Sequence, residues 1–518
     1  MMTNLKMLFW YGAFGAVCLA APVVHAVVLV ANLVLQTILL VGQWVSARLP
    51  VKNPVRRAFA DEQAMVSIHV PAYNEPPEVL SQTLRSLANL DWDNYEVLVI
   101  DNNTQEEAVW RPSERLCEEL GPRFKFFHVD RLSGFKAGAM NYVRRRMHRR
   151  ADFVLVVDAD YQLEPDAIRQ ALRYDTDPKI GLLQFPQHYR NASKGNRGVV
   201  LDFEHFFSCY MRMANRLACV PSTGTLTFIR TRALVEVGGF DEEAITEDAE
   251  IGLRLTLAGH RNLYLHEVIG HGLLPFDLAS LKKQRWRWAF GNVQILKRSF
   301  SKLLFSPQLS WRQRLGFLVH LSAWSNFNLI PSLSLLLLAP LAWLNWISPL
   351  QVYLLVIAGL TLMTFVLAKA GVFFLTLRRD GYSLREIAEA FVSHLGLGMI
   401  FSTAWMKCLV NDREPFLRTN KFLSQRIPGV LSVAVTETAL GGLLLLSGLA
   451  LFAADFVLAP VAALLMAGAC LSVHWLGIQM RKTRELTADE AGVDDLTGEA
   501  GLSASDLDLA SSVGAARS

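Results

Sequence analysis

The sequence is short of charged residues. Of its 518 residues only 19% are Asp, Glu, Lys or Arg, while 52% are hydrophobic, and the mean hydropathy is +0.26. Soluble proteins of ordinary composition carry about 25% charged residues. This shortage argues against a purely soluble enzyme and indicates segments that never meet water.

Two further absences exclude other classes of protein. The 51 basic and 47 acidic residues leave a net charge of only +4, which is too even a balance for a nucleic-acid partner. The six cysteines include no C-x-x-C pair. Their scatter favours a reduced compartment, without a disulfide framework or a zinc site.

The hydrophobic residues lie on either side of a normally charged stretch, residues 62–300. Residues 5–45 are almost uncharged, and at ~20 residues per crossing they could form one or two transmembrane helices. A second interpretation is a signal peptide, with Lys6 as its basic end and Val24-His25-Ala26 as its cleavage site. Under either interpretation the positive-inside rule predicts a cytoplasmic domain next. The basic residues that follow the run are Arg48, Lys52, Arg56 and Arg57.

Four more apolar runs after residue 300 could each cross a membrane. They are residues 326–347, 350–376, 430–452 and 455–478. A fifth stretch, 384–410, could either cross the membrane as well or lie in the membrane interface. Its interruption by polar residues favours a helix in the interface, followed by a loop over 411–428. Its polar residues are Arg385, Glu386, Glu389, His394 and Lys407. The chain therefore divides into a membrane region over 1–50, a cytoplasmic domain over 62–300, a membrane region over 301–480 and a disordered acidic tail over 481–518.

Short apolar runs alternate with helical patterns inside the cytoplasmic domain. The expected strands are 65–70, 95–100, 124–129, 152–157 and 180–185, and the expected helices are 77–89, 105–120, 136–148 and 165–174. This alternation predicts an α/β, Rossmann-like domain with a mostly parallel sheet and helices on both faces. In such a sheet, ligands bind beyond the carboxyl ends of the strands.

Polar side chains follow three of these strands. The first strand ends in Pro71-Ala72-Tyr73-Asn74-Glu75, the second in Asp101, and the fourth in Asp158-Ala159-Asp160. Two oxygen ligands directly after a buried strand suit Mg²⁺ or Mn²⁺. Such a metal ion could neutralise a diphosphate leaving group.

Two later motifs have both a structural and a functional interpretation. Thr246-Glu247-Asp248 opens a helical pattern and could simply cap that helix. The segment Gln284-Arg285-Trp286-Arg287-Trp288 is typical of an amphipathic helix on a membrane surface. Such a helix can still turn Gln284, Arg287 and Trp288 toward a site, because positions i, i+3 and i+4 share one face.

Taken in order, these motifs resemble those of the membrane-integrated glycosyltransferases of family 2. That group includes the bacterial cellulose, hyaluronan and chitin synthases. The resemblance rests on residues 71–75, Asp101, Lys136-Ala137-Gly138-Ala139-Met140-Asn141, Asp158-x-Asp160, Thr246-Glu247-Asp248 and Gln284-x-x-Arg287-Trp288. It implies a GT-A-like catalytic domain combined with transmembrane helices. The chain departs from many relatives at Asn102, where they have a second Asp.

The resemblance also implies roles for individual residues. Tyr73, Glu75 and Asp101 would hold the uracil and ribose of a UDP-sugar, with Lys136 near the nucleotide. Asp158 and Asp160 would bind the metal, and Asp158 also the diphosphate, which Gln284 and Arg287 would clamp. Asp248 would be the general base of an inverting transfer. The acceptor would contact Gly224, Glu247 and Trp288, and residues 415–421 would form a gating loop over the site.

The resemblance implies an enzyme of the bacterial inner membrane with its catalytic domain in the cytoplasm. The favoured interpretation is a hexosyltransferase that extends a β-linked, glucan-like polysaccharide from a UDP-sugar and passes it through its own membrane helices. The alternative is a single transfer to a polyprenyl phosphate or another lipid. An exporter with an inactive transferase domain is disfavoured, because Asp158, Asp160 and Asp248 are intact. Expected partners are the donor, the polysaccharide acceptor, the lipid bilayer and a periplasmic export component.

Overall fold

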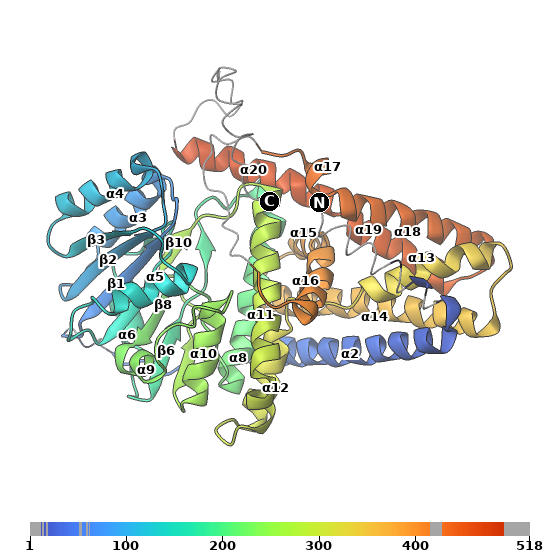
Figure 1. Ribbon diagram of the computed structural model, residues 1–518, viewed down its shortest axis with the longest axis horizontal. Helices are drawn as coiled ribbons and strands as arrows, with labels where there is room; N and C mark the ends of the chain where they lie inside the picture. The colour runs from blue at the N-terminus through green and yellow to red at the C-terminus, as the bar shows by residue number, and fades with distance from the viewer. Residues whose placement is uncertain are drawn as a thin grey trace, which may run out of the picture.

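The computed structural model describes residues 12, 15–16, 19–50, 54–58, 61, 63–414 and 427–491. An α/β domain lies at one end and a bundle of long helices at the other (Figure 1). The α/β domain corresponds to the expected catalytic domain and is called by that name below. Three expectations lie outside the described residues: most of the first N-terminal helix, the gating loop at 415–421, and the tail beyond residue 491.

The catalytic domain is built on a seven-stranded sheet in the order β3-β2-β1-β4-β8-β6-β9. Its strands are β1 (Val66–Ala72), β2 (Tyr95–Asn102), β3 (Phe124–Val129), β4 (Phe153–Val156), β6 (Ile180–Gln184), β8 (Thr227–Arg230) and β9 (Arg261–Tyr264). All five predicted strands are present within two residues of their expected ends. The prediction of a mostly parallel sheet is confirmed, and β8 runs antiparallel between β4 and β6.

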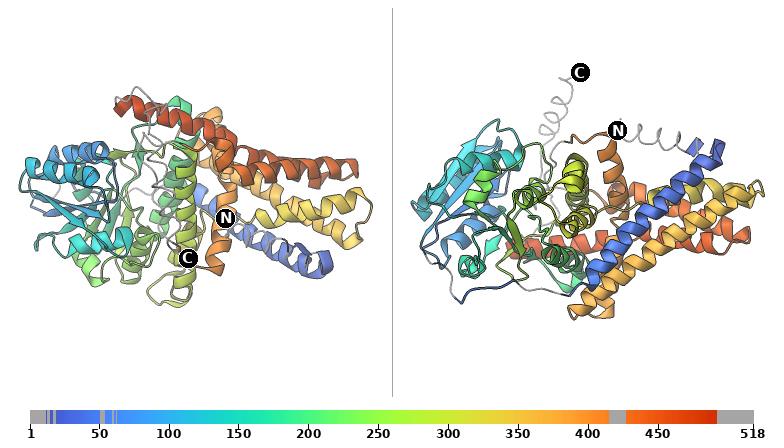
Figure 2. Two further views of the ribbon diagram at one scale, coloured as in Figure 1. Left: turned by 45° about the horizontal axis from the view of Figure 1, so that its top comes forward. Right: turned by 90° about the horizontal axis from the view of Figure 1, so that it is seen from below.

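Helices cover both faces of this sheet (Figures 1 and 2). They include α3 (Pro77–Ala88), α4 (Glu107–Leu120), α5 (Phe135–Arg144), α6 (Ala167–Leu172), α9 (Thr231–Glu236) and α10 (Glu247–Leu257). Alternate residues of β2 face opposite sides, as the pleat of a strand requires. Val97 and Val99 pack in the core that contains α3, whereas Leu98 and Ile100 pack against Ala139 and Val143 of α5.

A second, three-stranded sheet stands beside the main one, in the order β5-β10-β7. Its strands are β5 (Gln162–Leu163), β7 (His188–Tyr189) and β10 (Gly270–Gly272). These strands are too short to give an alternating sequence pattern. Each directly follows or precedes a segment that reaches the carboxyl edge of the main sheet.

Helices at the junction join the catalytic domain to the bundle. They are η1 (Lys194–Asn196), α7 (Arg197–Phe206), the π-helical turn η2 (Phe207–Met211), α8 (Arg212–Leu217), α11 (Leu278–Phe305) and α12 (Trp311–Leu321). Helix α11 carries the segment 284–288 and stands between the two parts in Figure 1.

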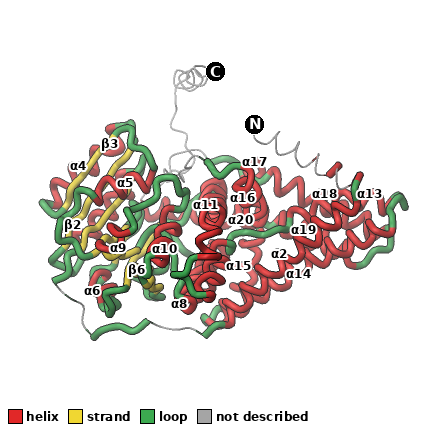
Figure 3. Tube along the Cα trace, turned by 60° about the horizontal axis from the view of Figure 1, so that its bottom comes forward, coloured by secondary structure: helices red, strands yellow, loops and turns green. Residues whose placement is uncertain are grey.

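The bundle contains the predicted membrane spans. Its helices are α2 (Pro22–Arg48), α13 (Leu329–Trp343), α14 (Pro349–Arg379), α18 (Val435–Ala453) and α19 (Leu458–Leu471), which run side by side (Figures 1 and 3). On α2, valine and isoleucine side chains such as Val27, Val34 and Ile38 are more than half exposed. Side chains of this kind on an outer helix face suit contact with lipid.

Five helices in the described part of the chain are long and apolar enough to cross a membrane. They cover residues 22–48, 349–379, 384–410, 435–453 and 458–486. The predicted span at 326–347 corresponds to α13, which at 15 residues is shorter than these five. A 15-residue helix is about 22 Å long, less than the ~30 Å hydrocarbon core of a bilayer.

The stretch predicted to lie in the interface, 384–410, is interrupted in the middle. It forms α15 (Leu384–Leu395) and α16 (Gly398–Val410), separated by a turn at residues 396–397. Helix α15 packs on α7 and α16 packs on α11, so both contact the catalytic side of the junction. An interfacial position for these helices stays a prediction.

The C-terminal boundary predicted at residue 481 falls inside a helix. After the short α17 (Val430–Val433) and the α18–α19 hairpin, α20 (Val473–Ala491) turns back toward the catalytic domain (Figure 1). Gln479 Oε1 accepts from the backbone N–H of Val199, and Asn196 Nδ2 donates to Thr483 Oγ1. These contacts with α7 and η1 extend the ordered chain past residue 481.

Candidate active site

A cavity of about 270 Å³ opens at the carboxyl edge of the main sheet. The parallel strands β1 and β4 bring residues 71–75 and 158–161 to this edge, and β6 brings Gln187. The antiparallel β8 contributes the loop before it, which includes Thr223 and Gly224, because its amino end lies at the same edge. Helices α10 and α11 contribute the lining residues Glu247, Asp248, Gln284, Arg287 and Trp288.

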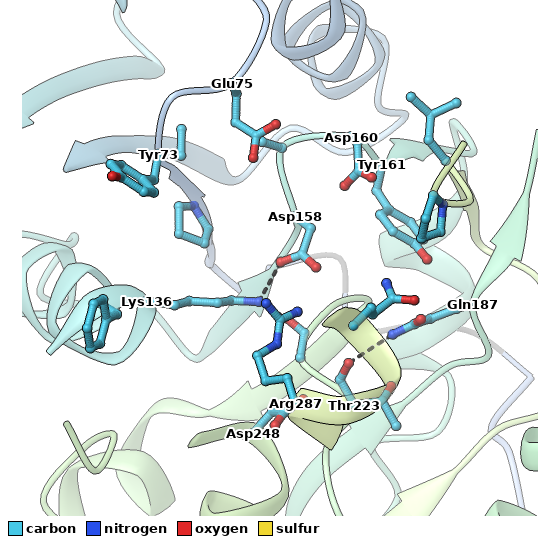
Figure 4. Close-up of a pocket in the computed structure, with 18 of the residues that line it drawn as sticks. Tyr73, Glu75, Lys136, Asp158, Asp160, Tyr161, Gln187, Thr223, Asp248 and Arg287 are labelled. Atoms are coloured by element: carbon cyan, nitrogen blue, oxygen red, sulfur yellow. Dashed lines mark hydrogen bonds and ion pairs between the residues drawn. The ribbon is translucent and has the colours of Figure 1, made fainter. Parts of the chain in front are cut away.

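Eleven of the twelve residues singled out in the sequence line this cavity. They are Tyr73, Glu75, Lys136, Asp158, Asp160, Gly224, Glu247, Asp248, Gln284, Arg287 and Trp288. Figure 4 shows the side chains of Glu75, Asp158 and Asp160 pointing toward the same space, with Lys136 and Arg287 reaching in from the opposite side. Residues from six separate stretches of chain therefore meet in one place.

Asp101 is the residue that the cavity does not include. Its carboxylate is buried, accepts from Thr104 Oγ1 at 2.8 Å, and lies 3.0 Å from His128 Nδ1. The Thr104 hydroxyl in turn accepts from the backbone N–H of Asn74. Asp101 thus supports the turn that carries Tyr73, while the neighbouring Asn102 and Asn103 line the cavity.

Lys136 connects the metal motif to the loop before β8. Its Nζ donates to Asp158 Oδ1 at 2.5 Å and to the carbonyl oxygen of Gly224 at 2.7 Å. Burial alone would lower the pKa of Lys136, but the carboxylates of Asp158, Glu247 and Asp248 outweigh it and raise that pKa above its usual value. Lys136 is therefore a fixed positive charge at the centre of the cavity.

Two adjacent carboxyl groups begin α10 at the floor of the cavity. Burial, together with the neighbouring charge of Asp248, raises the pKa of Glu247 to about 7. Burial also raises the pKa of Asp248, against the opposing effect of Lys136 and Arg287. A carboxylate with a raised pKa is a stronger base, which suits proton abstraction from a hydroxyl group.

Several polar atoms of the wall are left over for a ligand. Thr223 Oγ1, Thr246 Oγ1 and Gln284 Oε1 are buried, and none has a hydrogen-bond partner among the described residues. Buried polar groups without partners are uncommon in folded proteins and are expensive to maintain. All three belong to residues that line the cavity, so a rotation of these side chains would offer their oxygen atoms to a polar ligand.

The sequence reasoning missed several lining residues. Gln187, Tyr161 and Tyr189 contribute an amide and two phenol rings to the wall, and Phe135 and Phe276 contribute apolar surface. The Gln187 Nε2 donates to the carbonyl oxygen of Thr223. Its position shortly after the predicted strand at 180–185 was the signal that could have identified it.

The described residues contain no group of three or more His, Cys, Asp or Glu side chains that could hold a metal ion alone. Asp158 and Asp160 offer two carboxylates on the cavity wall. Mg²⁺ commonly takes one or two carboxylates and completes its shell with substrate phosphates and water. The residues present therefore fit a metal that arrives with a phosphorylated substrate.

Comparison with known protein families identifies this domain. A model described as "Glycosyl transferase family 2" matches residues 67–234, and one described as "Glycosyl transferase family group 2" matches residues 153–370. Together they cover more than half of the chain. The chain belongs to glycosyltransferase family 2. The expected resemblance, the enzyme class and the GT-A-like fold are thereby confirmed.

Relatives of this glycosyltransferase make β-linked polysaccharides, according to their names. It is 27% identical over 260 residues to glucomannan 4-beta-mannosyltransferase 7 of Arabidopsis thaliana, covering 48% of this chain and 46% of the relative. It is 29% identical over 317 residues to the cellulose synthase 1 catalytic subunit [UDP-forming] of Komagataeibacter xylinus, covering 57% and 39%. The matches thus span less than half the length of these relatives.

A weaker structural likeness extends further along the glycosyltransferase. The mannosyltransferase PcManGT from Pyrobaculum calidifontis, in complex with GDP-Man and Mn²⁺, has a TM-score of 0.49 and 17% identity. The likeness covers 76% of this chain and 99% of that one. A likeness of this strength says nothing about the donor or the metal of the present enzyme.

Proposed function

We propose that this glycosyltransferase is an inverting β-glycan synthase of a bacterial inner membrane. It transfers a hexose from a UDP-sugar to a growing β-linked, glucan-like polysaccharide and passes the product across the membrane. The catalytic domain would face the cytoplasm, and a periplasmic export component would receive the polymer. The names of the relatives support a β-glycan product.

One observation carries this proposal. The cavity combines a charged side, with Lys136, Asp158 and Arg287, and an aromatic acceptor candidate, Trp288. Trp288 lies on α11, the helix that packs on α16 and leads into the membrane region. A polymer held at Trp288 would therefore start at the entrance to the helix bundle. A synthase that extends and exports a chain needs this arrangement, whereas a single-transfer enzyme does not.

The reaction can be written in terms of the cavity's own residues. Asp248 takes the proton of the acceptor hydroxyl, and the hydroxyl oxygen forms a bond to the anomeric carbon of the donor sugar. The bond between that carbon and the diphosphate oxygen breaks on the opposite face, so the diphosphate leaves with the electron pair and the configuration inverts. Lys136 and Arg287 supply positive charge beside the leaving diphosphate.

A divalent cation completes this proposal. Asp158 and Asp160 would hold Mg²⁺ or Mn²⁺, and the bound ion would neutralise charge on the diphosphate. Tyr73 and Glu75 would contact the nucleoside, and Gln284 with Arg287 the diphosphate. Gly224, Glu247 and Trp288 would contact the acceptor. These roles follow from the family resemblance and from the position of each residue on the wall.

The test is product analysis with purified full-length protein in nanodiscs. The protein is incubated with Mg²⁺ or Mn²⁺ and with radiolabelled UDP-glucose, UDP-N-acetylglucosamine or GDP-mannose. We expect a high-molecular-weight product from one UDP-sugar, degraded by a β-specific glycosidase, and no product in EDTA. Label found only in an organic extract would instead establish single transfer to a lipid, and a product from GDP-mannose alone would correct the donor.

A further inference from the structure

A fully buried ion pair lies directly behind the cavity. Arg285, inside the segment 284–288, donates from Nη2 to Asp202 Oδ2 at 2.6 Å. The side chains of Arg285 and Asp202 are 0% and 2% exposed. Asp202 lies on α7 and Arg285 on α11, so the pair joins the two helices at the junction.

Burying this ion pair costs free energy, because both charged groups lose their contact with water. Arg285 Nε and Nη1 are buried and have no hydrogen-bond partner among the described residues. Replacing a buried ion pair with apolar residues of similar volume often leaves stability unchanged or higher. A contribution to folding stability therefore does not explain why this pair is present. A role in holding the geometry of the neighbouring site explains it.

The guanidinium group lies against a cluster of three aromatic rings, one of which, Trp288, lines the cavity. Its central carbon is 3.8 Å from the ring centre of Phe203, 4.7 Å from that of Trp324 and 5.0 Å from that of Trp288. The rings of Phe203 and Trp324 also contact Trp288 directly, each at 5.7 Å between centres. Trp288 is thus held from behind by one cation and two rings, while it faces the cavity.

The other oxygen of Asp202 connects this cluster to the interrupted helix pair. Asp202 Oδ1 lies 2.9 Å from Nδ1 of His394, which belongs to α15. The His394 ring packs 5.3 Å from Phe401 of α16, and Phe401 packs 5.5 Å from Trp324. The contacts that begin at Asp202 therefore lead through His394 and Phe401 to Trp324, one of the two rings that support Trp288.

We propose that the Asp202–Arg285 ion pair is a positioning device that fixes the Trp288 ring for the acceptor. Arg285 acts through Trp288 and does not touch the reacting atoms. The inference rests on the proposed function in one respect, since it takes Trp288 as an acceptor-binding residue. It adds two residues to the site that neither the family motif nor the cavity wall identifies.

Two variants separate positioning from folding. Arg285→Lys keeps the charge but loses the planar group that stacks on the rings. The double variant Asp202→Asn/Arg285→Met removes both charges, and its asparagine can still hydrogen-bond His394. Arg212→Met is the matched control, because Arg212 also ties the catalytic side to the membrane helices, through Asp380 at 2.6 Å, and lies outside the aromatic cluster around Trp288.

The measurements are the KM for the acceptor, kcat, the Kd for UDP and the melting temperature of the full chain in nanodiscs. The acceptor probe is a cello-oligosaccharide, or a manno-oligosaccharide if the wild-type protein elongates only that one. We expect both Arg285 variants to raise the acceptor KM about tenfold, with UDP affinity within twofold of wild type. The Arg212→Met control should leave the acceptor KM unchanged.

Either of two results would overturn the inference. One is an unchanged acceptor KM in both Arg285 variants. The other is a parallel loss of UDP affinity, kcat and melting temperature, as expected of a purely structural pair. If wild-type protein labels only lipid, polymer synthesis fails as the proposed function, and the same KM comparison with that lipid still decides the role of Arg285.

Discussion

Gly224 leaves little room for a side chain in the candidate active site. Its φ of +86° is one that L side chains rarely adopt, and a Cβ added there would lie 2.7 Å from Asp248 Oδ2 and 3.4 Å from Lys136 Nζ. Its carbonyl oxygen also accepts the hydrogen bond from Lys136. The glycine therefore allows the loop before β8, the lysine and the proposed base to approach one another.

We expect Gly224→Ala to lower kcat/KM about 100-fold, because a shift of about 1 Å at reacting groups can have that effect. The left-handed conformation should also cost about 1 kcal/mol of stability. Gly238→Ala is the matched control, since Gly238 has a φ of +84° and no atom within 4 Å of an added Cβ. Equal kcat/KM in the two variants would contradict the close approach.

The pH dependence of transfer should follow the carboxyl pair on α10. Burial raises the pKa of Asp248 and, together with Asp248, raises that of Glu247 to about 7. A base must be deprotonated to accept a proton, and burial raises the pKa of Asp248, so kcat/KM should fall with decreasing pH at a higher pH than an ordinary aspartate would cause. A pH profile of kcat/KM checks this. A flat profile from pH 5 to 8 would show that the pair titrates in its ordinary range.

Two elements of the catalytic domain show what the sequence could and could not predict. The bounds of strand β2 were predicted to within two residues, because a strand that is buried on both faces has a continuous run of apolar residues. The antiparallel direction of β8 was not predictable, because Thr227–Arg230 has the same local pattern in either direction. That direction decides which loop reaches the cavity, and so it places Gly224 there.

The role of the buried Gln184, at the end of β6, could not be predicted from the local sequence pattern either. Its Oε1 accepts from the backbone N–H of Thr223 and the hydroxyl of Thr227, while its Nε2 donates to the carbonyl oxygen of Thr225. These bonds hold the loop before β8 against the sheet. A single amide that bonds to two residues of the loop before β8 and to the first residue of β8 is a tertiary arrangement, which a one-dimensional pattern does not record.

Gln184→Met should therefore destabilise the protein by about 3 kcal/mol, because it leaves buried donors and acceptors unpaired. Gln187→Met should cost less than about 1 kcal/mol, since Gln187 is only partly buried and makes one bond to the loop. Thermal unfolding of both variants in the same nanodiscs checks the difference. A Gln184→Met protein as stable as Gln187→Met would contradict the loop-holding role.

The low proportion of charged residues in the chain reflects its helix bundle, and the catalytic domain packs directly against this bundle. One continuous apolar core includes Val154 of β4, Phe290 of α11, Phe401 of α16 and Leu476 of α20. The catalytic domain therefore shares its core with helices on the membrane side. The sequence predicted both parts, but not this shared core, because its members are up to hundreds of residues apart.

A fragment covering residues 62–305 should consequently fail to form a soluble monomer. Removing α16 and α20 would expose the apolar surface that they cover, and exposed patches of this kind promote association. Size-exclusion chromatography of the fragment, beside the full chain in detergent, is the measurement. A monodisperse, UDP-binding fragment in plain buffer would show that the catalytic domain is independent of the bundle.

The central claim is that this cavity performs glycosyl transfer with Asp248 as its base. Its most direct test is Asp248→Asn in the full-length protein, with UDP binding measured by calorimetry and transfer measured from the radiolabelled donor. We expect UDP affinity close to that of wild type and a transfer rate at least about 1,000-fold lower. A variant that transfers sugar at the wild-type rate would contradict the account.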